Sequence, residues 1–155
     1  MENFIYSIPT TIYFGKGQIE HVAQAVRPYG KKALIVYGGG SVKKNGIFDR
    51  VTEILEHEGI AWEELGGVEP NPRIETVRKG AELCKAGNIE VVLPIGGGST
   101  IDCAKIIAAG ALYDGDAWDL VLDGKKIQAA LPIVAVLTLA ATGSEMDTAA
   151  VISDM

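Results

Sequence analysis

The sequence predicts an α/β fold in which helices cover both faces of an open parallel β-sheet. Short apolar runs alternate with amphipathic helical segments, and this alternation is typical of a parallel sheet with crossover helices. Two of the apolar runs are followed by the same peptide, Gly-Gly-Gly-Ser, at residues 38–41 and 96–99. The chain has 155 residues, 48% of them hydrophobic and 22% charged. It is therefore long enough to bury a core and too apolar to be disordered.

Apolar runs between turn-forming residues predict the strands, at 4–8, 11–14, 32–37, 60–65, 90–95 and 132–137. The runs at 32–37 and 90–95 are almost continuously apolar, as expected of strands that a parallel sheet buries on both faces. The first two runs lie on either side of Pro9 and are expected to form two short strands.

Apolar residues at helical spacing predict the helices, at 17–26, 47–58, 74–86 and 101–112, with a short helical turn at 117–121. The helix at 47–58 places Ile47, Val51 and Ile54 on one face and is expected to end at Gly59. The order of strands and helices predicts one Rossmann-like domain over residues 1–155. A final apolar stretch at 149–152 has no cap or turn after it, so we expect the domain to be truncated at its C-terminal end.

Composition and charge exclude several classes of function. The formal net charge is −6 and no cluster of Lys and Arg offsets it, which argues against nucleic acid or a membrane surface as a partner. No apolar run is long enough to span a membrane, and the N-terminus lacks the pattern of a signal peptide. Cys84 and Cys103 fall inside predicted helices, which suggests a reducing compartment, so a cytoplasmic protein is expected. The only histidines, His21 and His57, are far apart, so a self-contained imidazole metal site is not expected.

The two glycine triplets are candidate phosphate-binding turns. Each follows a predicted strand and precedes a helix, which places free backbone N–H groups and a positive helix end at the carboxyl edge of the sheet. Two such turns on one edge favour a nucleotide site, although each alone could be only a tight turn. Neither turn completes the G-x-G-x-x-G pattern, and neither continues into the Gly-Lys-Ser/Thr of an ATP-hydrolysing P-loop.

Polar residues near the second turn have two interpretations that spacing does not separate. Asp102 could accept a hydrogen bond from a ribose hydroxyl or a nicotinamide amide, or it could only complement the helix dipole. The hydroxyls of Thr138, Thr142 and Ser144 lie at the end of the next strand, where they could contact a ligand or only stabilise the turn.

Three segments together resemble a known family. They are Asn71-Pro72, the peptide at 96–105 (GGGSTIDCAK) and the peptide at 137–145 (LTLAATGSE). Their combination resembles the iron-containing (group III) alcohol dehydrogenases, over essentially the whole chain. The peptides at 36–41, 43–46 and 113–116 are most similar to the butanol dehydrogenase branch of that family.

The resemblance implies an N-terminal domain that binds NAD(P). It assigns the pyrophosphate to Gly97, Gly98, Ser99 and Asp102, and it places Asn71, Thr138 and Thr142 along the adenosine and nicotinamide portions. Family members that prefer NAD tend to have an acidic residue at the adenosine ribose. This sequence has Gly38 and Gly39 there, followed by Ser41, so a 2′-phosphate is not repelled and NADP(H) is expected to be preferred over NAD(H).

The resemblance also implies a metal that this chain does not bind. The family's Fe²⁺ or Zn²⁺ is held by an Asp and three His of a C-terminal all-helical domain, and no residue here matches those positions. The intact enzyme is expected to interconvert primary alcohols and aldehydes, such as butanol and butanal, as an NAD(P)-dependent oxidoreductase. The 155-residue chain alone is expected to be inactive, and an exposed sheet edge makes a homodimer a further expectation.

Two alternatives stay open. One is a free-standing nucleotide-binding regulatory module that catalyses no reaction. The other is half of a glycerol-dehydrogenase-like enzyme, because glycerol dehydrogenases and dehydroquinate synthases are similar in their N-terminal halves. The turn at 38–41 and the peptide at 142–145 favour the butanol type over these.

Overall fold

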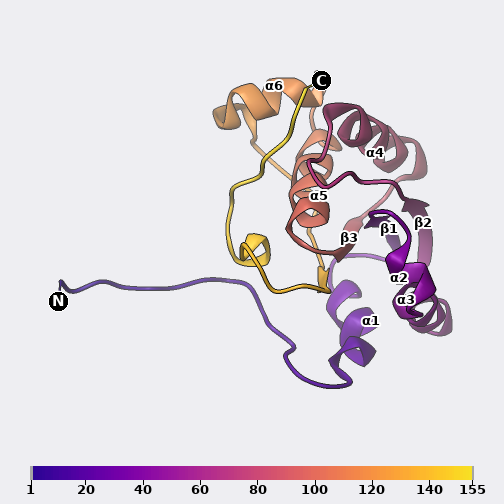
Figure 1. The fold of residues 1–155 in the computed structure, drawn as a ribbon. Coiled ribbons are helices and arrows are strands. Elements are labelled where there is room, and N and C mark those ends of the chain that lie inside the picture. The colour runs from indigo at the N-terminus through magenta and orange to yellow at the C-terminus, as the bar shows by residue number, and fades with distance from the viewer. Residues whose placement is uncertain (1, 155) are drawn as a thin grey trace.

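A computed structural model describes residues 2–154, and a parallel β-sheet lies at its centre (Figure 1). Its strands are β1 (Lys32–Tyr37), β2 (Ala61–Leu65), β3 (Val91–Gly96) and β4 (Val136–Leu137), in the order β2-β1-β3-β4. Every pair of neighbouring strands is parallel. Residues 91–96 are all buried, as their continuous apolar run predicts, whereas β2 is an edge strand with only Leu65 buried.

Helices cover both faces of the sheet, which confirms the predicted fold class. One face packs against α1 (Val22–Val26) and α3 (Ile47–His57), through Ala33 and Ile35 of β1. The other face packs against α4 (Ile74–Gly87), α5 (Gly98–Gly110) and α6 (Ala117–Leu122), through Leu34 and Val36. Successive residues of one strand therefore serve two separate cores, as the pleat of a β-strand requires.

Short helical segments complete the described part of the chain. They are α2 (Ser41–Lys44) and the 3-10 turns η1 (Gln18–His21), η2 (Gly124–Lys126) and η3 (Ser144–Met146). The glycines at 38–40 separate β1 from α2, and Gly40 adopts a left-handed conformation with φ of 96° that favours glycine.

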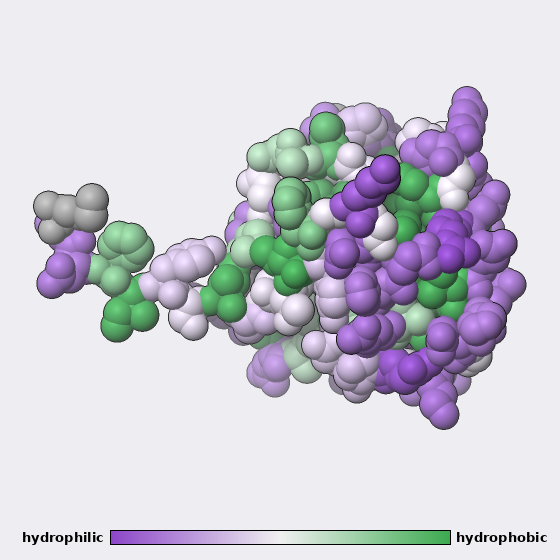
Figure 2. Space-filling view, turned by 90° about the horizontal axis from the view of Figure 1, so that it is seen from below, coloured by the Kyte–Doolittle hydropathy of each residue, from purple (hydrophilic) through white to green (hydrophobic). Residues whose placement is uncertain are grey.

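The two strands predicted at 4–8 and 11–14 are absent from the described structure. Residues 2–14 form an extended arm that projects from the body (Figures 1 and 2), and its apolar side chains, including Phe4, Ile5 and Phe14, are exposed. A strand is stable only when a neighbouring backbone accepts and donates its hydrogen bonds, and the described sheet offers this segment no such pairing. Composition alone predicts the extended backbone but cannot supply the partner.

Two further boundaries differ from the prediction. Helix α5 begins at Gly98 and not at 101, because Gly98 and Ser99 already belong to the helix, whereas Gly97 is still extended. The strand predicted at 132–137 is reduced to β4, with one isolated bridge between Ile133 and Val92. The final apolar stretch forms no strand and ends in a bridge between Ser153 and Arg73.

Helices α4 and α5 approach closely at Gly80, which makes this glycine a test of the packing. A Cβ atom there would lie 2.4 Å from Cδ1 of Ile107 and 3.0 Å from Cδ2 of Leu65. We expect Gly80→Ala to lower the free energy of unfolding by about 1–3 kcal/mol, because overpacking outweighs the better helix propensity of alanine. Urea denaturation measures this.

The matched control is Gly124→Ala, because a Cβ at that position meets no heavy atom within 4 Å. We expect its unfolding midpoint to stay close to that of the unchanged chain. A Gly80→Ala chain as stable as the control would contradict the described contact between α4 and α5.

Candidate nucleotide-binding site

A cleft lies at the carboxyl edge of the sheet, where the direction of the chain reverses. From β1 the chain crosses to β2 on one side, and it then returns to β3 on the other side of β1. This topological switch point is where open parallel sheets bind ligands. The cleft has a volume of about 730 Å³ and is lined by the loops that follow all four strands, at Gly39, 67–70, 97–100 and 139–142.

Helix α5 begins at the floor of this cleft with free amide groups. Ile101 N is the first amide to bond back along the helix, to Gly97 O at 3.1 Å. The amides of Gly98, Ser99 and Thr100 therefore have no acceptor inside the helix, and no side chain caps the helix at Gly97. These N–H groups and the positive end of the helix dipole favour an anion such as phosphate.

Glycine leaves the cleft open at two of its walls. A Cβ added at Gly97 would meet nothing nearer than Cβ of Leu139, at 4.0 Å, and one at Gly39 would meet nothing within 4 Å. Gly98 differs, because a Cβ there would lie 2.7 Å from the hydroxyl oxygen of Thr142. Gly98 therefore allows the wall at Thr142 to approach the start of α5, whereas Gly97 and Gly39 leave space for a ligand.

Hydrogen bonds tie the loops of the cleft to one another. The Ser99 hydroxyl donates to the carbonyl of Pro70, which joins the start of α5 to the loop after β2. Thr138 N donates to Gly96 O at 3.0 Å, and Gly67 N donates to Gly38 O at 3.0 Å. These contacts within the chain hold the loops of the cleft in fixed positions.

The charges that line the cleft are negative. Glu69 and Asp102 are among its lining residues, and the described lining includes no Lys or Arg. Asp102 accepts hydrogen bonds from Ser144 Oγ at 2.5 Å and from Val151 N at 3.0 Å. A phosphate in this cleft would therefore be bound by backbone amides and the helix dipole, and not by a basic side chain.

A charged cluster lies at the carboxyl ends of β1 and β2. Lys43 Nζ lies 2.9 Å from Glu64 Oε2, and the Tyr37 hydroxyl donates to the same oxygen at 2.8 Å. Hydrogen bonds with Tyr37 and Glu64 raise the pKa of Lys43. Burial acts to raise the pKa of Glu64, but the hydrogen bonds from Lys43 and Tyr37 outweigh it and lower that pKa. Lys43 is thus a cation close to the turn at 38–41, and its charge is already paired.

Some of the residues assigned to the cofactor from the sequence line the cleft and others lie beside it. The lining residues are Gly39, Gly97, Gly98, Ser99, Asp102 and Thr142. The other four are not in its described lining: Gly38, Ser41, Asn71 and Thr138. Gly38 and Thr138 bond to neighbouring loops through the backbone, Ser41 is exposed at the start of α2, and Asn71 is exposed next to Pro70.

The sequence analysis missed the wall formed by residues 67–70. The loop after β2 lacks the Gly-Gly-Gly-Ser peptide, and the family resemblance assigned only Asn71 of this loop to the cofactor. The parallel topology would have been sufficient to predict this wall, because all strands of a parallel sheet end at the same edge.

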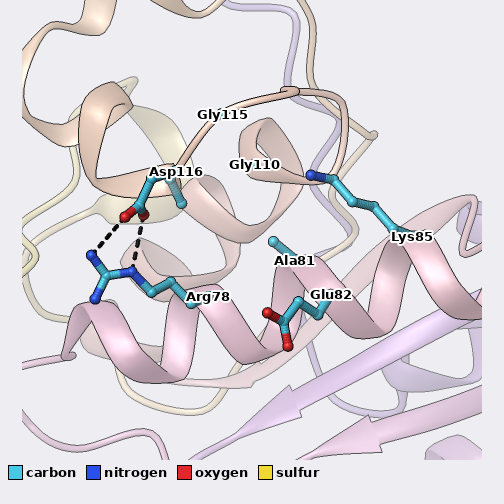
Figure 3. Close-up of a pocket in the computed structure, with 8 residues that line it drawn as sticks. Arg78, Ala81, Glu82, Lys85, Gly110, Gly115 and Asp116 are labelled. Carbon is cyan, nitrogen blue, oxygen red and sulfur yellow. Dashed lines mark hydrogen bonds and ion pairs between the residues drawn. The ribbon is translucent and has the colours of Figure 1, made fainter.

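A second, smaller cavity of about 250 Å³ lies between α4 and the loop that joins α5 to α6 (Figure 3). Three of its four charged lining residues make contacts within the chain, and Glu82 is the fourth. Arg78 donates to both oxygens of Asp116, at 2.9 and 2.8 Å, and Lys85 Nζ donates to Tyr113 O at 2.7 Å. The bonds from Arg78 lower the pKa of Asp116. The Arg78–Asp116 pair braces the start of α6 against α4, and the bond from Lys85 attaches the loop before α6 to the same helix.

The described residues do not fit a metal centre. Between residues 2 and 154, no group of three or more His, Cys, Asp or Glu side chains is placed to hold an ion. Cys84 and Cys103 are buried and unpaired, and burial raises the pKa of both thiols to about 12, so they stay protonated at neutral pH. No helix in the same part of the chain is both long and apolar enough to cross a bilayer.

Comparison with known proteins agrees with this geometry. The family model of iron-containing alcohol dehydrogenases matches residues 9–155. The chain is 60% identical over 155 residues to NADH-dependent butanol dehydrogenase A of Clostridium acetobutylicum. The alignment covers 100% of this chain and 40% of that protein. It is 44% identical over 156 residues to the NADPH-dependent aldehyde reductase YqhD of Escherichia coli, with 99% and 40% covered.

A solved structure shows the same fold. The crystal structure of NADH-dependent butanol dehydrogenase A from Thermotoga maritima superposes with a TM-score of 0.94 at 48% identity, covering 99% of this chain and 39% of that one. The chain thus spans about 40% of the length of the relatives that it matches. The family match over nearly the whole chain, together with the shared fold, means that this chain belongs to the iron-containing alcohol dehydrogenase family.

Proposed function

We propose that the cleft binds a nicotinamide dinucleotide, with the pyrophosphate at the start of α5. The observation that supports this most directly is the set of free amides at 98–100, which face a space that the missing side chain of Gly97 leaves open. Gly39 and Thr142 lie on two other walls of the same cleft, where the adenosine and nicotinamide ends would extend. The names of the relatives, which include NADH- and NADPH-dependent dehydrogenases, support the same cofactor class.

The proposed reaction of the longer protein is the interconversion of a primary alcohol and an aldehyde, such as butanol and butanal. A nicotinamide bound here would supply hydride chemistry: an alcohol and NAD(P)⁺ would give an aldehyde, NAD(P)H and a proton, with the hydride leaving the carbon that bears the oxygen and the proton leaving the hydroxyl. The residues of this chain bind and orient the dinucleotide. They do not fit the metal that the family name implies, so the chain alone is expected to catalyse no turnover.

We further propose that NADP(H) is preferred over NAD(H). The turn at 38–41 has no carboxylate to repel a 2′-phosphate, and Ser41 offers a hydroxyl close to it. The charge of Lys43 is paired with Glu64, whereas the exposed Lys44 makes no ion pair with the residues that the structure describes and is the next cation along the chain. Relatives are named for both cofactors, and a direct titration therefore decides the preference.

The homodimer stays a prediction, which sedimentation equilibrium tests.

The first prediction of this function concerns binding of the two cofactors by the 155-residue chain. We expect both NADPH and NADH to bind saturably, with NADPH about tenfold tighter, the usual effect of one charge-assisted hydrogen bond to the 2′-phosphate. Fluorescence titration of the purified chain measures both dissociation constants. Tighter binding of NADH would contradict the NADP(H) preference, and binding of neither would contradict the nucleotide site.

A variant at Gly39 separates the preference from the site itself. Gly39→Asp places a carboxylate on the cleft wall without a steric conflict, because a Cβ there meets nothing within 4 Å. We expect NADPH to bind at least about tenfold more weakly to this variant, because like charges repel, and NADH to bind as before. An equal loss of affinity for both cofactors would mean that residue 39 does not lie near the 2′ position of the adenosine ribose.

The third prediction concerns the start of α5, where we propose that the pyrophosphate binds. Gly97→Ala should leave the fold intact, because the new methyl group has space in the free protein. The same methyl should keep a phosphate from the free amides at the start of α5 and weaken NADPH and NADH alike, by about tenfold or more. The control is Gly124→Ala, which lies outside the cleft lining. Unchanged affinity in folded Gly97→Ala would show that the pyrophosphate lies elsewhere.

A further inference from the structure

A lysine on α5 makes a set of contacts that the proposed function does not use. Lys105 Nζ donates to Ser144 Oγ at 2.9 Å, to Asp147 Oδ1 at 2.8 Å and to Ala149 O at 2.7 Å. These three bonds use all three protons of the ammonium group. The Lys105 side chain is only 15% exposed, so its charge lies largely outside bulk water and depends on these partners.

Asp102 extends the same network by one turn of the helix. It lies three residues before Lys105 and therefore on the same face of α5. Its carboxylate accepts from the Ser144 hydroxyl at 2.5 Å and from Val151 N at 3.0 Å. Ser144 is buried and joins the two charged groups, because its hydroxyl accepts from Lys105 and donates to Asp102. The network thus attaches the segment 144–151 to α5.

This attachment lies directly after the wall of the cleft at 139–142. At its other end the wall is attached by the pairing of β4 with β3 and by the bond from Thr138 N to Gly96 O. Between these two attachments the described wall has little support of its own, because residues 139–142 are exposed and adopt no helix or strand. Release of the second attachment would free the wall that faces Gly98.

We propose that Lys105 is a positioning residue for the cofactor cleft, which fixes the wall at 139–142 over the start of α5 by binding the segment that follows it. The proposal rests on the proposed function, because it assigns Lys105 a part in binding the dinucleotide without contact to it. Lys105 is not in the described lining of the cleft. The hydrogen bond from Lys105 and the one from Ala149 N lower the pKa of Asp147, which agrees with a stable ion pair.

The test replaces Lys105 by methionine, which keeps the length of the side chain and removes its charge and donors. The matched control is Lys79→Met on α4, an exposed lysine for which the described structure gives no ion pair or side-chain hydrogen bond. We expect Lys105→Met to bind NADPH about tenfold more weakly at a temperature where it is fully folded, and Lys79→Met to bind as before. Lys105→Arg, which restores the charge and several donors, should recover part of the affinity.

Two readouts test the attachment without any cofactor. In Lys105→Met, a glutamate-specific protease should cut after Glu145 faster, and the pKa of Asp147 measured by NMR should rise toward its ordinary value. If Lys105→Met does not fold, Ser144→Ala tests the attachment by the rate of cleavage alone, because it removes the bridging hydroxyl and leaves the Lys105–Asp147 pair.

The outcomes separate the two proposals. Suppose that the wild-type chain binds NADPH. If the folded Lys105→Met variant then shows either unchanged affinity or an unchanged rate of cleavage, the role of Lys105 is overturned and the proposed function stays intact. A wild-type chain that binds neither dinucleotide would overturn both, even if faster cleavage establishes that Lys105 holds the segment. Weaker binding together with faster cleavage supports the positioning role.

Discussion

Free amide groups at the start of α5 are the constraint on which the rest of the site depends. A helix leaves its first N–H groups without internal partners, and here no side chain at Gly97 satisfies them. Glycine at 97 and 98 keeps their surroundings clear and lets the wall at Thr142 approach. Since no Lys or Arg is in the described lining, these amides and the helix dipole are the main attraction that the cleft offers to a phosphate.

The position of α5 follows from its packing in the core. Its residues are apolar on nearly all sides, and it packs between the sheet and α4, where Gly80 permits close approach to Ile107. Its few charged residues, Asp102 and Lys105, lie on one face and bind the segment 144–151. One helix therefore supplies the end that we propose to bind phosphate and the attachment of the opposite wall. A change in its packing should alter both together.

The sequence predicted much of this fold because the central strands have an unambiguous composition. The runs at 32–37 and 90–95 are almost continuously apolar after their first residues, Lys32 and Glu90, and this pattern is typical of a strand buried on both faces. The strands at 4–8 and 11–14 were predicted wrongly because a strand needs a partner, which composition does not reveal. The glycine motifs located the cleft, but they did not reveal the wall at 67–70 or the contacts of Lys105, which depend on residues far apart in sequence.

The measurement that tests the phosphate-binding role of α5 most directly is an NMR titration of the ¹⁵N-labelled chain with NADPH. The amides at 97–100 should show the largest chemical-shift changes, because phosphate oxygens would accept hydrogen bonds from them. Smaller changes are expected at Gly39 and Thr142, which line other walls of the cleft. The amides around Arg78 and Asp116, which line the second cavity, should not move. Shifts confined to that second cavity, with none at 97–100, would contradict a dinucleotide site at the start of α5.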